Sequence, residues 1–129
     1  MAERRRPPLD AGLVRAELAA RDVPWRGLRV LGATGSTNRD AADLARQGAP
    51  TGTGVLADEQ TQGRGRLQRG WVSPPGASMS LSVVLRPSVP AERWGWLPLL
   101  VGVAVLEGVR DVLAGEYKEL RALGLKWPN

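Results

Sequence analysis

Apolar side chains recur at helical spacing in three stretches of the chain. The first predicted helix follows Asp10, whose side chain can cap its amino end, and it runs to about Arg21. The second begins near Thr37 and ends before Gly48, because a glycine there can take the left-handed conformation that terminates helices. The third and longest covers residues 93–113, and its nearly continuous apolar run predicts burial on several sides.

Shorter apolar runs bounded by glycine or proline predict strands between these helices. They cover residues 28–31, 55–58 and 80–85, and a further strand is expected to begin at Gly124. Helices and strands follow one another without an internal repeat. This order favours an α+β fold in which a mixed β-sheet is flanked by helices.

Composition narrows the chemistry that the chain can perform. Its 129 residues include no His and no Cys, which excludes a Ser-His-Asp triad, cysteine nucleophiles, disulfides and the common zinc sites. The net charge of +5 comes mainly from arginines at 4–6 and at 64–69. We interpret residues 1–8 as a disordered basic tail and residues 9–129 as one domain. No apolar stretch is long enough for a signal peptide or a membrane span, so we expect a cytoplasmic protein.

The most informative segment is 63–71, which reads Gly-Arg-Gly-Arg-Leu-Gln-Arg-Gly-Trp. Guanidinium groups are planar, permanently charged forks that suit phosphate and carboxylate groups. Glycines let backbone N–H groups come close to an anion. We therefore predict a flexible cationic loop, directly after the strand at 55–58, that closes around a phosphorylated ligand.

Two other functions are compatible with part of this pattern. Runs of Arg and Gly bind RNA through phosphate contacts and stacking, which would also explain the positive charge. That alternative gives no role to the polar segments at 36–38 and 126–129. A nucleotide-binding enzyme of another class fits less well, because the glycine spacing in 63–70 matches neither the dinucleotide motif nor the Walker motif.

Three segments, in this order, resemble the catalytic domain of biotin–protein ligases: Ser36-Thr37-Asn38, Gln60 with the Gly-Arg-Gly-Arg run, and Lys126-Trp127-Pro128-Asn129. The resemblance covers roughly residues 28–129 and implies a fold related to class II aminoacyl-tRNA synthetases. It implies an enzyme that activates biotin with ATP and Mg²⁺ to biotinyl-5′-AMP. The biotin then passes to a lysine of the biotin carboxyl carrier protein or domain of acetyl-CoA carboxylase or a related carboxylase. Neither nucleic acid nor a membrane is an expected partner, and a monomer or a homodimer is expected.

The resemblance also implies roles for individual residues. Arg66 and Lys126 are expected to be catalytic, as cations beside the biotin carboxylate and the adjoining phosphate. Ser36, Thr37 and Gln60 offer the short donors and acceptors that the ureido ring of biotin requires. The other implied contacts to biotin or its adenylate are Asn38, Gly63, Arg64, Gly65, Arg69 and Trp71.

Several of these residues also have a purely structural interpretation. Ser36 and Thr37 can cap the second helix, and Thr37, followed three residues later by an acidic side chain, approximates a capping box. Trp71 can serve as an anchor in a core that is poor in aromatic residues. The acidic pair at 58–59 is interpreted as solvated, and no metal ligand is assigned.

The sequence departs from the family pattern at two points. Gln68 stands where the family commonly has Gly, and a positive φ at that position would strain a glutamine. The chain also ends at Asn129, before an aspartate, further strands and a small C-terminal β-domain of the family. Little sequence precedes Leu28 to form a winged-helix domain. We therefore expect a partial catalytic domain that is incomplete at its C-terminus. The sequence is compatible both with an active and with an inactive truncated chain. Lipoate–protein ligases and octanoyltransferases share the fold but lack the Gly-Arg-Gly-Arg run and typically use His or Cys.

Overall fold

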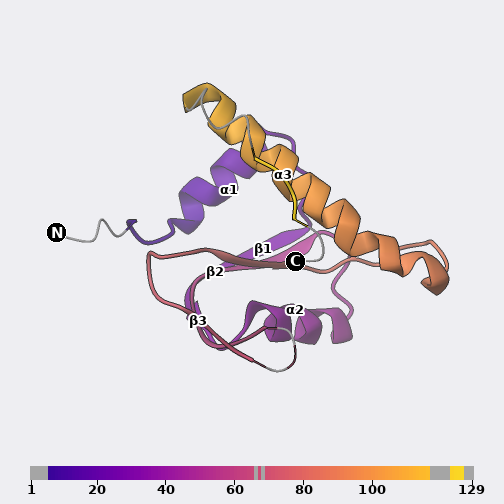
Figure 1. Cartoon of the computed structure of the whole chain (residues 1–129). Helices are drawn as coiled ribbons and strands as arrows, with labels where there is room; N and C mark the ends of the chain where they lie inside the picture. Colours follow the sequence, from indigo (N-terminus) through magenta and orange to yellow (C-terminus); the bar gives the residue numbers. More distant parts are fainter. Residues whose placement is uncertain (1–5, 66, 68, 117–122, 127–129) are drawn as a thin grey trace. The chain divides into compact units, whose positions relative to one another are not determined.

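The computed structural model describes residues 6–65, 67, 69–116 and 123–126 (Figure 1). The chain divides into two compact units, Met1–Arg86 and Pro87–Asn129. The first unit contains the sheet and two helices, and the second contains one long helix with its flanking segments. The assignment of residues 1–8 to a disordered tail and of 9–129 to one partial domain stays a prediction.

The first unit is organised around a four-stranded mixed sheet whose centre is β2 (Thr53–Arg64). Strand β1 (Gly27–Thr34) pairs with β2 in parallel. Strands β4 (Ser80–Val83) and β3 (Gly70–Ser73) pair with it in antiparallel fashion, along its first and its last part respectively. The same residues of β2 pair with β1 and with β4, so these two strands occupy opposite edges of β2. The α+β prediction with a mixed sheet is confirmed.

Two helices flank this sheet, on opposite sides of it in Figure 1. Helix α1 (Ala11–Ala20) is capped by Asp10, whose Oδ1 accepts a hydrogen bond of 2.9 Å from the N–H of Leu13. Helix α2 (Thr37–Arg46) packs against β2 and β4. Both lie close to their predicted positions, because each has a side-chain cap in the sequence where the helix starts.

The cap of α2 is one residue earlier than the predicted capping box. The Ser36 hydroxyl accepts from the N–H of Arg39 at 3.4 Å, whereas Thr37 is the first helical residue. The Asp40 carboxylate instead accepts a hydrogen bond from the Thr34 hydroxyl. The shift releases the Thr37 side chain from capping and turns it toward the sheet, where it contributes to the site described below.

Helix α2 ends in a Schellman motif at Gly48, as predicted. Gly48 has φ +93°, its N–H donates to the Ala45 carbonyl at 3.1 Å, and the Ala49 N–H donates to the Leu44 carbonyl at 2.9 Å. These two bonds satisfy carbonyl groups that the helix end leaves without partners.

Replacing Gly48 by Ala is expected to lower the free energy of unfolding by about 1–2 kcal/mol, because a Cβ atom disfavours the left-handed region. Urea denaturation followed by circular dichroism measures the change. Gly32→Ala is the matched control, because Gly32 has no positive φ and a Cβ there meets no atom within 4 Å. Equal stability of the two variants would contradict this account of the helix end.

The core of the first unit lies between α2 and the sheet. Ala41 of α2, Val55 of β2 and Val84 after β4 are buried and form one cluster, against which Leu31, Leu44 and Ala45 pack. Val55 is fully buried. β2 is therefore the strand that the packing fixes most firmly, and it carries the polar site at its far end.

The arginine–glycine segment is part of a β-hairpin instead of the predicted free loop. Strand β2 continues through Gly63 and Arg64, and β3 begins at Gly70, opposite Arg64. The predicted strand at 55–58 is thus only the buried half of β2. Sequence pattern missed the other half because its residues are polar or glycine, and backbone pairing needs no apolar side chain.

The second unit begins with the 3₁₀ turn η2 (Ala91–Trp96), which continues into helix α3 (Leu97–Glu116). The apolar run was expected to be buried on several sides, but Leu100 is 61 % exposed and Val112 is 68 % exposed. This unit holds too little chain to surround a long helix. The strand expected from Gly124 is not formed over the described residues 123–126. Within the described part of the chain, every helix is too short or too polar to cross a lipid bilayer.

Candidate functional site

A polar cluster lies where the amino end of α2 meets β2 and β4. Thr37 is 3 % exposed, and both its N–H and its hydroxyl donate to Oε1 of Gln60, at 2.9 and 3.0 Å. The same hydroxyl lies 2.8 Å from the hydroxyl of Ser82, which donates to Oδ1 of Asn38 at 2.6 Å. The fold therefore brings the predicted residues Thr37, Asn38 and Gln60 together, with Ser36 adjacent as the helix cap.

The short oxygen–oxygen contacts of this cluster outnumber its hydroxyl protons. Three contacts involve the hydroxyl groups of Thr37 and Ser82, yet each hydroxyl supplies one proton. When these two protons point to Gln60 and Asn38, the contact between the two hydroxyls has none. An N–H group of a ligand could supply a proton at this contact, while the amide groups of Gln60 and Asn38 offer further donors to a ligand.

The cationic hairpin is closed by short-range backbone contacts. The Gly65 N–H donates to the Arg69 carbonyl at 2.7 Å, so both residues lie at the neck of the turn. A Cβ atom at Gly63 would lie 2.7 Å from the Trp71 carbonyl oxygen, so this close pairing requires glycine. Within the turn, Leu67 has φ +58°, a conformation that costs a non-glycine residue about 1–2 kcal/mol.

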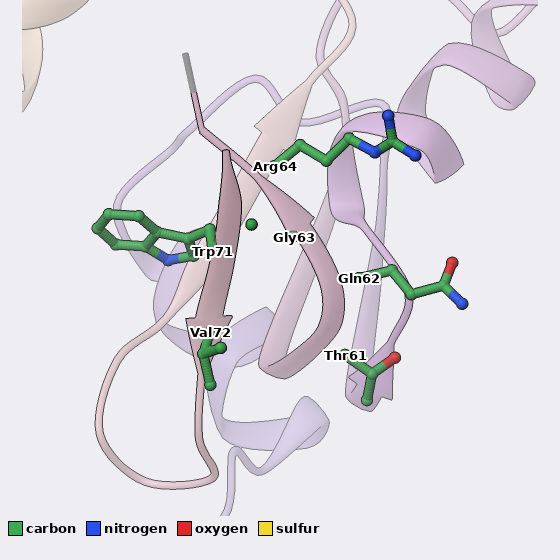
Figure 2. A pocket seen from close by; sticks show the side chains of 7 residues that line it. Thr61, Gln62, Gly63, Arg64, Trp71 and Val72 are labelled. Carbon is green, nitrogen blue, oxygen red and sulfur yellow. The ribbon is translucent and has the colours of Figure 1, made fainter. Parts of the chain in front are cut away.

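Beside the hairpin lies a pocket of about 570 Å³ whose lining is Thr61, Gln62, Gly63, Arg64, Gly70, Trp71 and Val72. In Figure 2 the Trp71 ring lies on one side of the hairpin, and the Arg64 guanidinium group extends on the other. Trp71 is 60 % exposed, which contradicts the alternative that it anchors the core. Its indole ring instead offers an exposed apolar surface at the pocket.

The loop before α2 connects the polar cluster with the hairpin. The N–H of Gln62 donates to the Gly35 carbonyl at 2.8 Å, and its Oε1 accepts from the Arg39 guanidinium at 3.3 Å. The segment around Ser36 is therefore held against β2 just before Gly63. The pocket lining includes Arg64 but not Ser36, so cluster and pocket are neighbours along β2.

Other predicted site residues lie elsewhere. Arg69 is exposed in the turn, and Lys126 is exposed in the second unit. Arg66 lies outside the described residues, as do Gln68 and Trp127. Among the described residues of the turn, Leu67 has the left-handed conformation.

Sequence reasoning missed two buried polar residues. Ser82 joins Thr37 to Asn38. In the sequence it stands two residues before Val84, a spacing that puts both side chains on the same inward face of an extended segment. Asp58 was interpreted as solvated, but it is 5 % exposed and forms an ion pair with Arg6. Among the described residues, no three acidic, His or Cys side chains come together as a metal site.

Comparison with known proteins identifies relatives of this chain. The family model described as "Biotin/lipoate A/B protein ligase family" matches residues 31–129. The chain is 44 % identical to a biotin–[acetyl-CoA-carboxylase] ligase of Mycobacterium tuberculosis, over 98 % of this chain and 47 % of that relative. It is 43 % identical to the bifunctional ligase/repressor BirA of Bacillus subtilis, over 73 % of this chain and 27 % of that relative.

A solved structure gives the same result for the fold. The biotin protein ligase from Aquifex aeolicus, in complex with biotin and ATP, superposes with a TM-score of 0.62 at 32 % identity. The match covers 81 % of this chain and 40 % of that chain. The chain thus spans about half the length, or less, of the relatives it matches. Because the family model extends from the middle of β1 to the last residue, the chain belongs to the biotin/lipoate A/B protein ligase family.

Proposed function

We propose that this chain is part of a biotin–protein ligase that forms biotinyl-5′-AMP from biotin and ATP and transfers the biotin to a lysine. One observation carries the proposal. A buried polar cluster around Thr37 and Gln60 lies next to a cationic hairpin on the same strand. The named activities of the relatives support the same choice.

The cluster is suited to the ureido ring of biotin. That ring carries two N–H donors and one carbonyl acceptor, and it is rigid and uncharged. Its N–H groups would donate to side-chain oxygens of Thr37, Ser82 or Asn38. The carbonyl would accept a hydrogen bond from the hydroxyl of Ser36, which is half-buried. A buried site built on hydrogen bonds rejects analogues that lack the matching groups, so it gives specificity as well as affinity.

The hairpin is suited to the reacting end of the molecule. A carboxylate oxygen of biotin attacks the α-phosphorus of ATP, the bond to the leaving oxygen breaks, and pyrophosphate departs. Two anions must approach each other in this step, so fixed cations and N–H groups supply most of the stabilisation. Arg64 would provide charge at the pocket, and Arg69 would add charge from the adjoining turn. The backbone of Gly63, which also lines the pocket, leaves room for an anion to approach. We assign Arg66 and Lys126 to the same carboxylate and phosphate oxygens.

The product of that step is a mixed anhydride, which water hydrolyses. Trp71 supplies an apolar surface beside the pocket that would shield the adenylate. In the second step the Nζ atom of a carrier lysine attacks the carbonyl carbon, AMP leaves, and the amine loses a proton. Mg²⁺ would enter this scheme with the phosphates of ATP, whose charge it would help to neutralise.

The acceptor in this proposal is the biotin carboxyl carrier domain of acetyl-CoA carboxylase or a related carboxylase. The reaction uses ATP and a carboxylase subunit, so we assign it to the cytoplasm. A monomer or a homodimer fits the proposal, and neither nucleic acid nor a membrane is a partner in it.

Thr37→Val is expected to weaken biotin binding by at least about tenfold, because it removes a hydroxyl from a buried network and leaves its partners unsatisfied. Isothermal titration calorimetry with biotin, and with a non-hydrolysable analogue of biotinyl-5′-AMP, measures the effect on the full chain. Binding is the first property to measure, since it needs fewer groups than turnover does.

The matched control is Thr53→Val, the same substitution at the start of β2. It is expected to leave the dissociation constant for biotin unchanged. The proposal is wrong for this chain if the wild-type protein shows no saturable heat with either ligand. It is also wrong if the two variants bind biotin equally well.

A further inference from the structure

Strand β2 bulges just before the cationic hairpin, because its pairing with β3 shifts register between Gln60 and Gly63. The two residues in the bulge are Thr61 and Gln62. A bulge re-aims side chains, since the bulged residues need not follow the pleat of the strand. In Figure 2 both side chains extend on the side of the hairpin opposite to Trp71. The bulge therefore directs these two residues away from the indole ring.

The bulge binds the loop that leads into α2. The hydroxyl of Thr61 donates to the Thr34 carbonyl at 3.4 Å, and the N–H of Gln62 donates to the Gly35 carbonyl at 2.8 Å. Both acceptors lie directly before Ser36, whose side chain caps the helix. The start of the polar cluster is thus bonded to the strand that carries the hairpin.

Arg39 makes the same connection from the helix. Its N–H donates to the Ser36 hydroxyl at 3.4 Å, and its guanidinium group donates to Oε1 of Gln62 at 3.3 Å. A Cβ atom at Gly35 would lie 3.5 Å from the same Oε1, so the Gln62 side chain lies against the loop. One residue of α2 therefore contacts both the helix cap and the bulge.

The charge of Arg39 is poorly placed for the stability of the helix alone. Arg39 is the third residue of α2, at the positive end of the helix dipole, where a cation is unfavourable. Alanine is also the better helix former at this position. The bond to Gln62 offsets this disadvantage. Both residues lie outside the segments that resemble the biotin–protein ligases, so the resemblance gives them no role.

We propose that Arg39 and Gln62 are positioning residues that hold the loop at Ser36 at a fixed distance from the cationic hairpin. This inference rests on the proposed function, in which Thr37 belongs to the part of the site that binds biotin and Arg64 to the part that binds phosphate. A ligand that spans both parts binds more tightly when their separation is fixed in advance, because less conformational freedom is lost on binding. A ligand that occupies one part alone gains little from it.

Amide hydrogen exchange of the ligand-free full chain tests the contact itself. Arg39→Ala and Gln62→Ala are each expected to lower the protection factor of the amide at position 62, which donates to the Gly35 carbonyl, by about threefold. Arg46→Ala is the matched control, because it removes the same charge at the last residue of α2, and it is expected to leave this protection unchanged. The urea midpoint of Arg39→Ala is expected to match that of the wild type, since a cation also leaves the start of the helix.

Isothermal titration calorimetry tests the positioning role, with biotin and with a non-hydrolysable analogue of biotinyl-5′-AMP as ligands. Arg39→Ala and Gln62→Ala are each expected to weaken binding of the analogue by about threefold or more, and binding of biotin by less than about twofold. The double variant should lose no more than either single variant, because the two side chains act through one bond. Gln62→Glu keeps an oxygen acceptor for the guanidinium group, and it is expected to retain the affinity of the wild type.

The proposal and the proposed function can fail separately. Equal protection in Arg39→Ala and Arg46→Ala would overturn the proposal, and so would additive losses in the double variant. Equal losses of biotin and of the analogue would also overturn it, since the pair would then support the polar cluster alone. In these cases the proposed function stands as long as the wild type binds both ligands. If the wild type binds neither ligand while Arg39→Ala still lowers the protection, the proposed function is wrong and the positioning role falls with it.

Discussion

Replacing Asp58 by Ala is expected to lower the free energy of unfolding by about 2–3 kcal/mol, somewhat less than breaking a fully buried ion pair does, because Arg6 is partly exposed. Asp58 is 5 % exposed at the centre of the sheet, where its carboxylate binds the guanidinium group of Arg6. The N–H of Gly76 also donates to this carboxylate, at 3.4 Å. Removal of the carboxylate leaves the Arg6 guanidinium group without its anion at a site with reduced access to water. It also releases the loop that contains Gly76.

The contacts of Arg6 explain why the effect extends beyond one pair. The same guanidinium group donates to the Ser78 carbonyl at 2.8 Å, and the hydroxyls of Ser73 and Ser78 bond to each other. Asp58 and Arg6 thus hold the connection between β3 and β4 against β2. Because β3 is the second strand of the cationic hairpin, this tie also limits how far the hairpin can move.

Urea denaturation of the full chain measures the loss of stability. Glu59→Gln removes the adjacent negative charge at a half-buried position, and it is expected to stay within about 0.5 kcal/mol of the wild type. The double variant with Arg6→Ala should lose less than the sum of the single changes, because the pair is then removed as a unit. Additive losses would show that the two side chains do not depend on each other.

Replacing Gly63 by Val is expected to open the β2–β3 pairing and to lower the free energy of unfolding by about 2–3 kcal/mol. The new Cβ would lie 2.7 Å from the Trp71 carbonyl oxygen and 3.0 Å from Nε2 of Gln60. The first of these atoms belongs to the backbone and cannot rotate away. The hairpin must therefore separate, which also displaces the side chain that binds Thr37.

Amide hydrogen exchange detects this opening directly, since the Gly65 N–H loses its acceptor when the hairpin separates. Gly65→Ala is the matched control, because the nearest atom to its Cβ is the Arg69 carbonyl oxygen at 3.6 Å, an ordinary contact. Protection of the Gly65 amide should survive that change. Unaltered exchange in Gly63→Val would refute the proposed role of the close pairing.

Local signals in the sequence predicted most of the helices. Asp10 caps α1 and Gly48 ends α2 where expected, because both act through bonds to residues within a turn of the chain. The start of α2 near Thr37 was predicted correctly, but the capping box was placed on Thr37, whereas Ser36 is the cap. Two neighbouring hydroxyls can both cap, and only the contacts with the sheet decide which one does. The long helix was correctly predicted, but its predicted burial was wrong.

Long-range contacts account for what sequence reasoning missed. Ser82 and Asp58 look like ordinary polar residues of a strand, and each gains its role from a partner more than forty residues away, Thr37 and Arg6 respectively. The arginine–glycine hairpin was predicted as a loop for a related reason. Its pairing is a property of β3, whose residues carry no strong strand pattern of their own.

By itself the sequence determined the chemical types available to this protein. It contains cations and hydroxyls without His or Cys, and the order of three motifs pointed to the family that the comparisons then showed. Only the tertiary structure decided which of these groups meet. It placed Thr37 beside Gln60 and buried Asp58 against Arg6. The physical reason is that burial and hydrogen-bond partnership belong to pairs of residues, and such pairs form only when the sheet brings distant segments together.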